Sequence, residues 1–199
     1  MIGFRWAAHL PTAPRPTIRK TRLVRCCADD SSSIRDLRAQ LEAALAREEY
    51  KDAARLRDAI QLKTMDAKLA VEEANGAFYA AFSSGNLQAM NEIWGFGDHI
   101  QVIHPLASTI AGREAVMDSW RSILKGVRPR AFNITLEDVR IYADEAHAFV
   151  TCVEVINADD SQGRITATNI FEKQDGKWKI TLHHGSEAPL RKKPSPFAT

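Results

Sequence analysis

Three side chains in apolar surroundings could act as a general acid or base. His104 ends an apolar run at residues 100–104, His184 closes another at residues 177–184, and Glu154 lies between two valines. An imidazole titrates near neutral pH, so it can take a proton from a carbon acid, and a carboxyl group can do so when its pKa is raised. His184, His104 and Glu154 are therefore the candidate catalytic residues, although Glu154 could equally face solvent.

The spacing in the last apolar run predicts which side chains face a pocket. Successive side chains of a strand point to opposite faces, so Trp178 and His184 would share one face while His183 takes the other. We expect the Trp178 face to turn inward, which makes His184 the better pocket candidate. His104 is the second candidate, because it shares a strand face with apolar residues.

Aromatic residues elsewhere could complete such a pocket. The candidates are Tyr79, Trp94, Trp120 and Trp178. Two imidazoles among several aromatic rings would suit a small, mostly apolar molecule with one polar group. The same residues could instead be structural, with the histidines held by hydrogen bonds and the aromatic rings packed in the core. The sequence does not supply an acid, a base and an oxyanion donor as a specific set, which favours a non-catalytic protein.

Several other kinds of site are not expected. His183 and His184 are adjacent, so strand alternation would point them apart, and the chain has no His-Glu-x-x-His, Cys-x-x-Cys or calcium-loop motif. It has no glycine-rich nucleotide motif either. We therefore expect no metal and no cofactor. No run approaches the ~18 apolar residues of a membrane span, and Cys152 lies in an apolar run, as a core thiol would.

The first residues differ in charge from the rest of the chain. Residues 1–28 carry six of the 27 Lys and Arg residues and none of the 25 Asp and Glu residues. This composition is typical of an organelle transit peptide. We expect import into the chloroplast stroma, with the mitochondrial matrix as the alternative. The remaining chain is acidic, which disfavours nucleic-acid binding. Residues 29–33 read as a linker, and residues 191–199 as a loose tail.

Residues 34–63 have the composition of a helical hairpin. Gly and Pro are absent, and strong helix formers dominate. Ser33 can cap the first helix, which would end before a polar reversal at residues 47–49. Apolar residues at steps of three and four predict two helices packed as a short antiparallel coiled coil, with Tyr50 and the leucines buried together.

Residues 41–60 resemble a UVR motif, the helical hairpin of bacterial excision-repair proteins and of plastid Clp adaptors. The resemblance rests on the pattern Tyr-x-x-Ala-Ala-x-Leu-Arg-Asp at residues 50–58. It implies that the hairpin docks a protein partner, with Tyr50, Arg55, Leu56 and Arg57 as the partner-binding candidates. The alternative is a charged helical extension that packs on the main domain.

The chain from residue 66 to residue 190 predicts one α+β domain. Helical spacing covers residues 70–82, 87–94 and 113–125, with a short strand at residues 99–105 between the last two. Strand patterns follow at residues 131–141, 147–157, 164–173 and 177–184, and Asp175-Gly176 predicts a tight turn. We expect three helices on one face of a curved antiparallel sheet.

The order of these elements resembles the nuclear transport factor 2-like superfamily, near its SnoaL-like branch. The motifs are His104-Pro105, the segment from residue 112 to Trp120, residues 168–171, and residues 175–178 leading to His183-His184. The resemblance implies a cone-shaped fold enclosing a cavity. Some relatives, such as ketosteroid isomerase and SnoaL-type cyclases, use a buried acid or histidine as a base.

Three functional hypotheses follow. The first is a non-catalytic chloroplast protein that forms a homodimer through the outer sheet face, holds a small apolar ligand or none, and docks a protein through the hairpin. The second is a small-molecule isomerase, cyclase or dehydratase that uses the pocket histidines. The third and weakest is a DNA-repair accessory, suggested only by the hairpin.

Overall fold

The structure is a computed structural model that describes residues 32–127, 132–158 and 161–189. The predicted transit peptide at residues 1–28 and the predicted tail at residues 191–199 lie outside these ranges. Among the described residues, no helix is both long enough and apolar enough to cross a membrane.

The N-terminal part is a helical hairpin of α1 (Ile34–Ala46) and the first turns of α2 (Tyr50–Ser84). The Ser33 hydroxyl accepts a hydrogen bond from the Asp36 backbone N–H at 3.0 Å, which is the predicted N-cap. A small apolar core holds the two helices together. Its buried members are Leu37, Ala44, Ala53 and Leu56.

Tyr50 is not part of this core. The prediction that it is buried with the leucines is wrong, because its side chain is 67% exposed. Tyr50 is the first residue of α2 and follows a turn in which Glu48 has a positive φ of 60°. At this end of the hairpin α1 has already stopped at Ala46, so no second helix covers the tyrosine ring.

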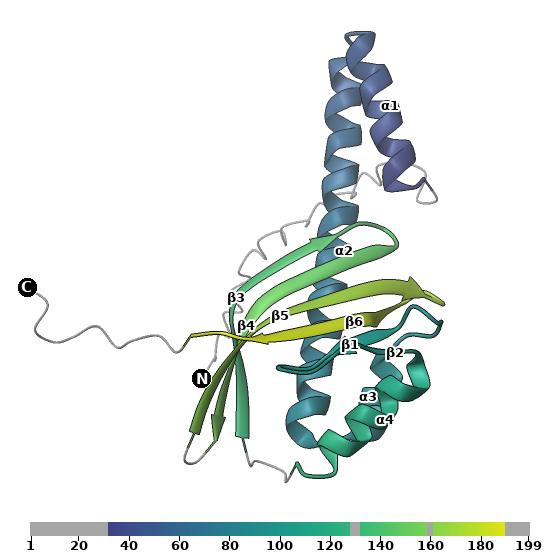
Figure 1. Cartoon of the computed structure of the whole chain (residues 1–199). Helices are drawn as coiled ribbons and strands as arrows, with labels where there is room; N and C mark the ends of the chain where they lie inside the picture. The colour runs from purple at the N-terminus through teal and green to yellow at the C-terminus, as the bar shows by residue number, and fades with distance from the viewer. Residues whose placement is uncertain (1–31, 128–131, 159–160, 190–199) are drawn as a thin grey trace, which may run out of the picture.

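The second helix is one continuous element of 35 residues. Its first half packs on α1 and its second half packs on the sheet (Figure 1). The predicted interval between hairpin and domain, at residues 64–65, therefore lies inside α2. The helix ends at Gly85, whose left-handed φ of 66° favours glycine, and the Asn86 side chain then caps α3 (Leu87–Ile93).

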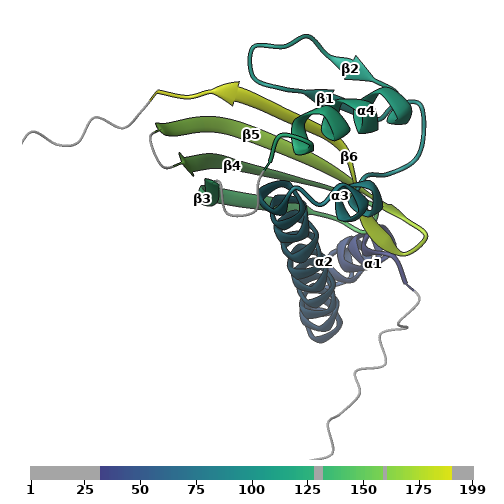
Figure 2. The same ribbon diagram turned by 90° about the horizontal axis from the view of Figure 1, so that it is seen from below.

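The six strands form one sheet in the order β2-β1-β6-β5-β4-β3. The four long strands are β3 (Phe132–Ala143), β4 (His147–Ala158), β5 (Ser161–Gln174) and β6 (Lys177–Glu187), and they form the predicted antiparallel meander. α2 lies against one face of this meander, and α4 (Arg113–Leu124) lies near β1 and β2 (Figure 2). A bulge in β3 between Glu137 and Arg140 bends the sheet.

The expectation of a wholly antiparallel sheet is wrong at one edge. β1 (Gln101–Ile103) pairs parallel with β6, with Val102 opposite His183. β2 (Ile110–Ala111) pairs antiparallel with β1, and its two residues are too few to give a strand pattern in the sequence. The chain leaves β1 through β2 and α4 and re-enters the sheet at its far edge as β3, so the β1–β6 pairing is not set by a hairpin and can be parallel.

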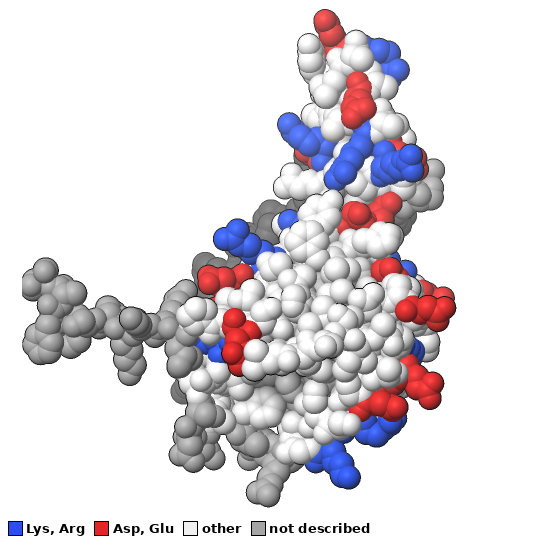
Figure 3. Space-filling model, viewed as in Figure 1, with Lys and Arg blue, Asp and Glu red and all other residues white. Residues whose placement is uncertain are grey.

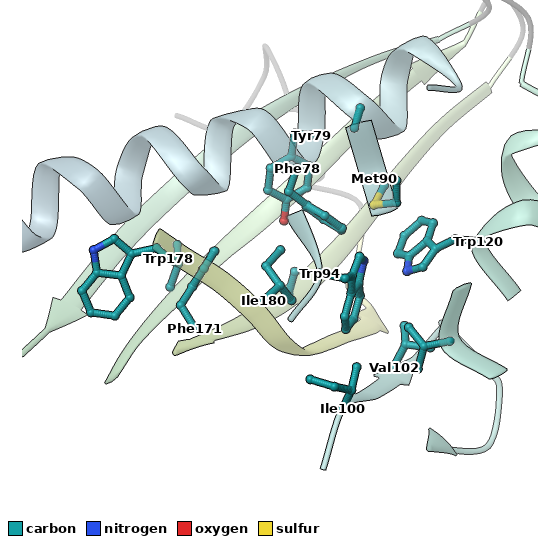
Figure 4. Close-up of a cluster of buried hydrophobic side chains, with 14 of the residues drawn as sticks. Phe78, Tyr79, Met90, Trp94, Ile100, Val102, Trp120, Phe171, Trp178 and Ile180 are labelled. Atoms are coloured by element: carbon teal, nitrogen blue, oxygen red, sulfur yellow. The ribbon is translucent and has the colours of Figure 1, made fainter. Parts of the chain in front are cut away.

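The main core lies between the concave face of the sheet and the helices. Aromatic rings dominate it: Phe78 meets Tyr79 at 5.0 Å and Trp120 at 5.5 Å between ring centroids, both edge to face. Figure 4 shows Phe78 above Ile180, with Trp94 beside Ile180 and Trp120 on the far side of Trp94. This packing fixes α2 and α4 over the sheet.

The burial difference between two hairpin residues can be tested directly. Leu56→Ala should weaken the hairpin by about 2–4 kcal/mol, because it leaves a cavity between α1 and α2. Tyr50→Ala should change the stability by no more than ~0.5 kcal/mol, since the ring is exposed. Hydrogen exchange of the α1 amides measures both effects. Equal protection losses in the two variants would contradict this packing.

Candidate functional site

A cluster of polar side chains is buried on the concave face of the sheet. It consists of Asn75 and Tyr79 from α2, Glu154 from β4, Asn169 from β5 and His183 from β6, all buried. Three neighbouring strands and the helix above them each contribute to it. Buried polar groups need hydrogen-bond partners, so the arrangement of these five residues is tightly constrained.

Hydrogen bonds join the cluster into a chain that ends at Glu154. The Tyr79 hydroxyl donates to Glu154 Oε1 at 2.8 Å. The Asn169 side-chain amide donates to the Tyr79 oxygen at 3.3 Å and to Asn75 Oδ1 at 2.8 Å. His183 Nδ1 lies 2.6 Å from Asn169 Oδ1, which can only accept, so the imidazole carries its proton on Nδ1.

Burial controls the ionisation of this cluster. It raises the pKa of Glu154 to about 7, although the hydrogen bond from Tyr79 opposes the shift. It lowers the pKa of His183 to about 3, with smaller contributions from His104 and His184. Near neutral pH, Glu154 can therefore hold or release a proton while His183 stays neutral.

His104 lies beside this cluster. Its ring meets Trp120 edge to face at 5.1 Å, and its Nε2 is 3.1 Å from Ser119 Oγ. Because the Ser119 hydroxyl donates to the Val116 carbonyl at 2.8 Å, it accepts from His104 Nε2–H. Burial lowers the pKa of His104 and so favours the neutral ring.

His184 lies outside the cluster, contrary to the prediction. Ile170 pairs with Leu182 and Phe171 pairs with Ile180, so Thr181 is an extra residue in β6. This bulge reverses the alternation of faces: Trp178 and Ile180 are buried as expected, but after Thr181 it is His183 that faces inward. His184 is exposed and lies 3.1 Å from the Ser186 hydroxyl.

The aromatic pocket candidates divide into two groups. Tyr79 belongs to the polar cluster, while Trp94 and Trp120 are almost fully buried in the core with 6.4 Å between their centroids. The indole N–H groups of these two tryptophans are buried without a hydrogen-bond partner. Trp178 is buried at the other end of the core, with the Lys173 ammonium 5.8 Å from its ring.

Sequence reasoning missed Asn75, Asn169 and His183 as cluster members. Asn169 had a detectable signal, because it alternates with Ala167 and Phe171 and so shares the inward face of β5. His183 had none, since the bulge at Thr181 depends on the pairing of β5 with β6.

Cys152 is buried beside the cluster, 3.4 Å from the Tyr79 hydroxyl, and burial raises its thiol pKa. In the described ranges, no group of three His, Cys, Asp or Glu residues could hold a metal ion.

The hairpin presents a second candidate surface. Leu45 and Tyr50 are exposed at its tip, where α1 ends and α2 begins. Arg55 pairs with Asp52 at 3.0 Å, and Arg57 pairs with Asp58 at 3.6 Å. Leu56 cannot contact a partner in this conformation, because it lies in the hairpin core. Of the four predicted partner-binding residues, three lie on the surface.

A third surface lies on the outer face of the sheet. Tyr142 and Phe149 stack there with 5.3 Å between ring centroids, and Ile170 is exposed beside them. They line a shallow apolar hollow of about 340 Å³. An exposed apolar patch of this kind is typical of a contact between proteins.

The fold and motifs place this chain in a known family. A model of the SnoaL-like domain matches residues 71–191, and a model of the UvrB/uvrC motif matches residues 31–62. The chain belongs to the SnoaL-like domain family. Both resemblances inferred from the sequence motifs are confirmed.

Solved structures support the same fold. A Streptomyces avermitilis protein of the NTF2-like family, named as a candidate dehydratase, is 25% identical with a TM-score of 0.57, covering 62% of this chain and 96% of its own. A candidate association domain of calcium/calmodulin-dependent protein kinase type II from Thiobacillus denitrificans is 32% identical with a TM-score of 0.54, covering 59% and 94%.

A curated plant protein is also similar. F-box protein SKIP8 of Arabidopsis thaliana is 29% identical over 117 residues, which are 59% of this chain and 49% of the relative. The chain thus matches about half the length of this relative.

The ionisation of Glu154 gives a prediction for stability against pH. Its pKa is raised by folding, so the native state binds more protons and stability falls as pH rises from about 4.5 to about 7. The loss should be on the order of 3 kcal/mol at pH 8. Glu154→Gln, which stays neutral, should remove this part of the pH dependence. Urea denaturation between pH 5 and pH 8 measures it, and identical slopes for both proteins would contradict the assignment.

Proposed function

We propose that this protein is a non-catalytic assembly and docking protein of the chloroplast stroma. Its SnoaL-like domain would form a homodimer through the outer sheet face, and its hairpin would bind a protein partner. The observation that carries the proposal is the continuity of α2, which makes hairpin and domain one rigid piece.

The continuity of α2 holds the hairpin tip at a fixed position. A helix of 35 residues extends for about 50 Å at 1.5 Å per residue. Its C-terminal half is anchored by Val71 and Phe78, both fully buried in the main core. A further contact ties α1 to the turn between β3 and β4, because the Ile34 backbone N–H donates to Glu145 Oε1 at 2.5 Å. A tip held in this way loses little conformational freedom on binding.

The chemistry of the tip favours a protein over a nucleic acid. Leu45 and Tyr50 offer exposed apolar area, and tyrosine is frequent among residues that dominate binding energies. The charged residues of the hairpin are of both signs (Figure 3), and Arg47, Arg55 and Arg57 each pair with an acid of the same hairpin. Such a surface lacks the basic face that binds a phosphate backbone.

The remaining parts of the proposal rest on composition and on the sheet. The acid-free segment at residues 1–28 supports import into the stroma. The stacked Tyr142 and Phe149 with the adjacent Ile170 support self-association through the outer sheet face.

The docking role can be tested by placing aspartate at exposed apolar residues. Leu45→Asp combined with Tyr50→Asp should weaken binding of the partner roughly tenfold, or ~1.4 kcal/mol. The amount of partner protein recovered by cross-linking in chloroplast stroma should then fall by about nine-tenths. Leu106→Asp is the control, since Leu106 is 89% exposed and lies in the loop between β1 and β2. Quantitative mass spectrometry of the cross-linked proteins is the measurement. Recovery of the same partners by both variants would end the docking proposal.

A second candidate function is acid–base chemistry on a small molecule. The buried Glu154 with a pKa of about 7 favours it, as does the neighbouring Tyr79. Once Glu154 is protonated it no longer needs the Tyr79 proton, which could then be donated to a developing oxyanion. The similarity to a candidate dehydratase points in the same direction. Glu154 would take the proton from carbon, and the neutral His183 would orient the amide of Asn169.

This second candidate predicts proton exchange in a carbon acid. Wild-type protein incubated with a set of cyclic ketones in D₂O should exchange the α-protons of at least one of them faster than buffer does, as followed by NMR. Glu154→Gln should reduce that exchange by roughly 100-fold, because it removes the base. An absence of exchange in the wild type across the set would count against catalysis and leave the docking proposal intact.

A further inference from the structure

An apolar stripe on α2 is left uncovered between the hairpin and the domain. Leu62, Met65 and Leu69 are 64%, 52% and 57% exposed. They are three and four residues apart, so they lie on one face of the helix. This face points away from Ala53 and Leu56, which contact α1, and from Val71 and Phe78, which contact the sheet.

Charges of opposite sign lie at the two ends of the stripe. Lys51 and Arg55 precede it on the same face, and Glu72 and Glu73 follow it. All four are exposed. Asp58, which pairs with Arg57 at 3.6 Å, and Asp66 also lie on this face, four residues to either side of Leu62. Arg55 pairs with Asp52 at 3.0 Å, but this pair is on the surface and can exchange for another acid at little cost.

The order of basic, apolar and acidic residues along α2 is complementary to itself under a two-fold rotation. If two α2 helices lie antiparallel with the axis near residues 63 and 64, Leu62 of one copy meets Met65 of the other. Arg55 of each copy then lies against Glu72 and Glu73 of its partner. A stripe with the same sign at both ends would repel a second copy in this arrangement, whereas this one attracts it.

We propose that the α2 stripe binds a second copy of this chain, with the two α2 helices packed antiparallel. Because the stripe and the outer sheet face lie on different sides of the molecule, both contacts can form together. The chain would then assemble beyond a dimer, with each hairpin beside the domain of its neighbour. This inference does not depend on the proposed docking function, and it adds a second surface to the proposed self-association.

The mass of the full chain in solution tests the proposal. In analytical ultracentrifugation, Leu62→Asp with Met65→Asp should halve the mass of the assembly, because the contact between α2 helices is lost. Phe149→Asp with Ile170→Asp should also halve it, because the contact through the sheet is lost. Leu106→Asp should leave the mass unchanged, and far-UV circular dichroism should stay the same in all variants. An unchanged mass in the stripe variant overturns this proposal, while an unchanged mass in the sheet variant overturns only the contact through the sheet.

A charge exchange distinguishes a second copy from any other occupant. Arg55→Glu alone, or Glu72→Arg with Glu73→Arg, should weaken this association about tenfold, since like charges then meet. The three substitutions together should restore it to within about threefold, because the attraction is re-formed with reversed signs. Failure of the triple variant to recover would overturn the antiparallel pairing even if the stripe variant had lost mass.

Discussion

The structure depends on one side of α2 being buried along most of its length. The helix keeps its backbone hydrogen bonds while its packing partner changes from α1 to the sheet, so that Leu56 and Phe78 are buried against different elements by the same helix. In water a helix gains most of its stability from such packing rather than from propensity. The hairpin therefore has a fixed direction relative to the sheet, and the far side of α2 is left open to solvent.

A second constraint is the single extra residue in β6. Thr181 has no residue of β5 opposite it in the strand register, and this shift decides which of two adjacent imidazoles is buried. With His183 inside, the hydrogen-bond chain through Asn169 and Tyr79 reaches Glu154. A regular strand would have put His184 there instead. The chemistry of the interior is thus set by the register of two strands as much as by the residue types.

The sequence predicts local features well and non-local ones poorly. The cap at Ser33, the helix end at Gly85 and the turn at Asp175-Gly176 follow from residues within a few positions of each other, and all are present. The parallel pairing of β1 with β6 joins segments some 80 residues apart, so no local pattern indicates it. The predictions for His183 and Tyr50 are wrong for the same reason. The burial of each residue depends on where another element begins, ends or shifts register.

The interior cluster and the outer surfaces place different demands on the same helix. A buried carboxyl group with a raised pKa costs folding free energy near neutral pH, and an apolar core of equal volume would avoid that cost. Tyr79 and Asn75 nevertheless project from α2 into the cluster, and they limit how far the helix can rotate without breaking hydrogen bonds. If α2 turned about its own axis by the angle between successive residues, about 100°, Leu62, Met65 and Leu69 would no longer face the second copy in the proposed two-fold arrangement. The polar cluster therefore fixes the rotation of α2 about its own axis, which apolar packing alone specifies less sharply.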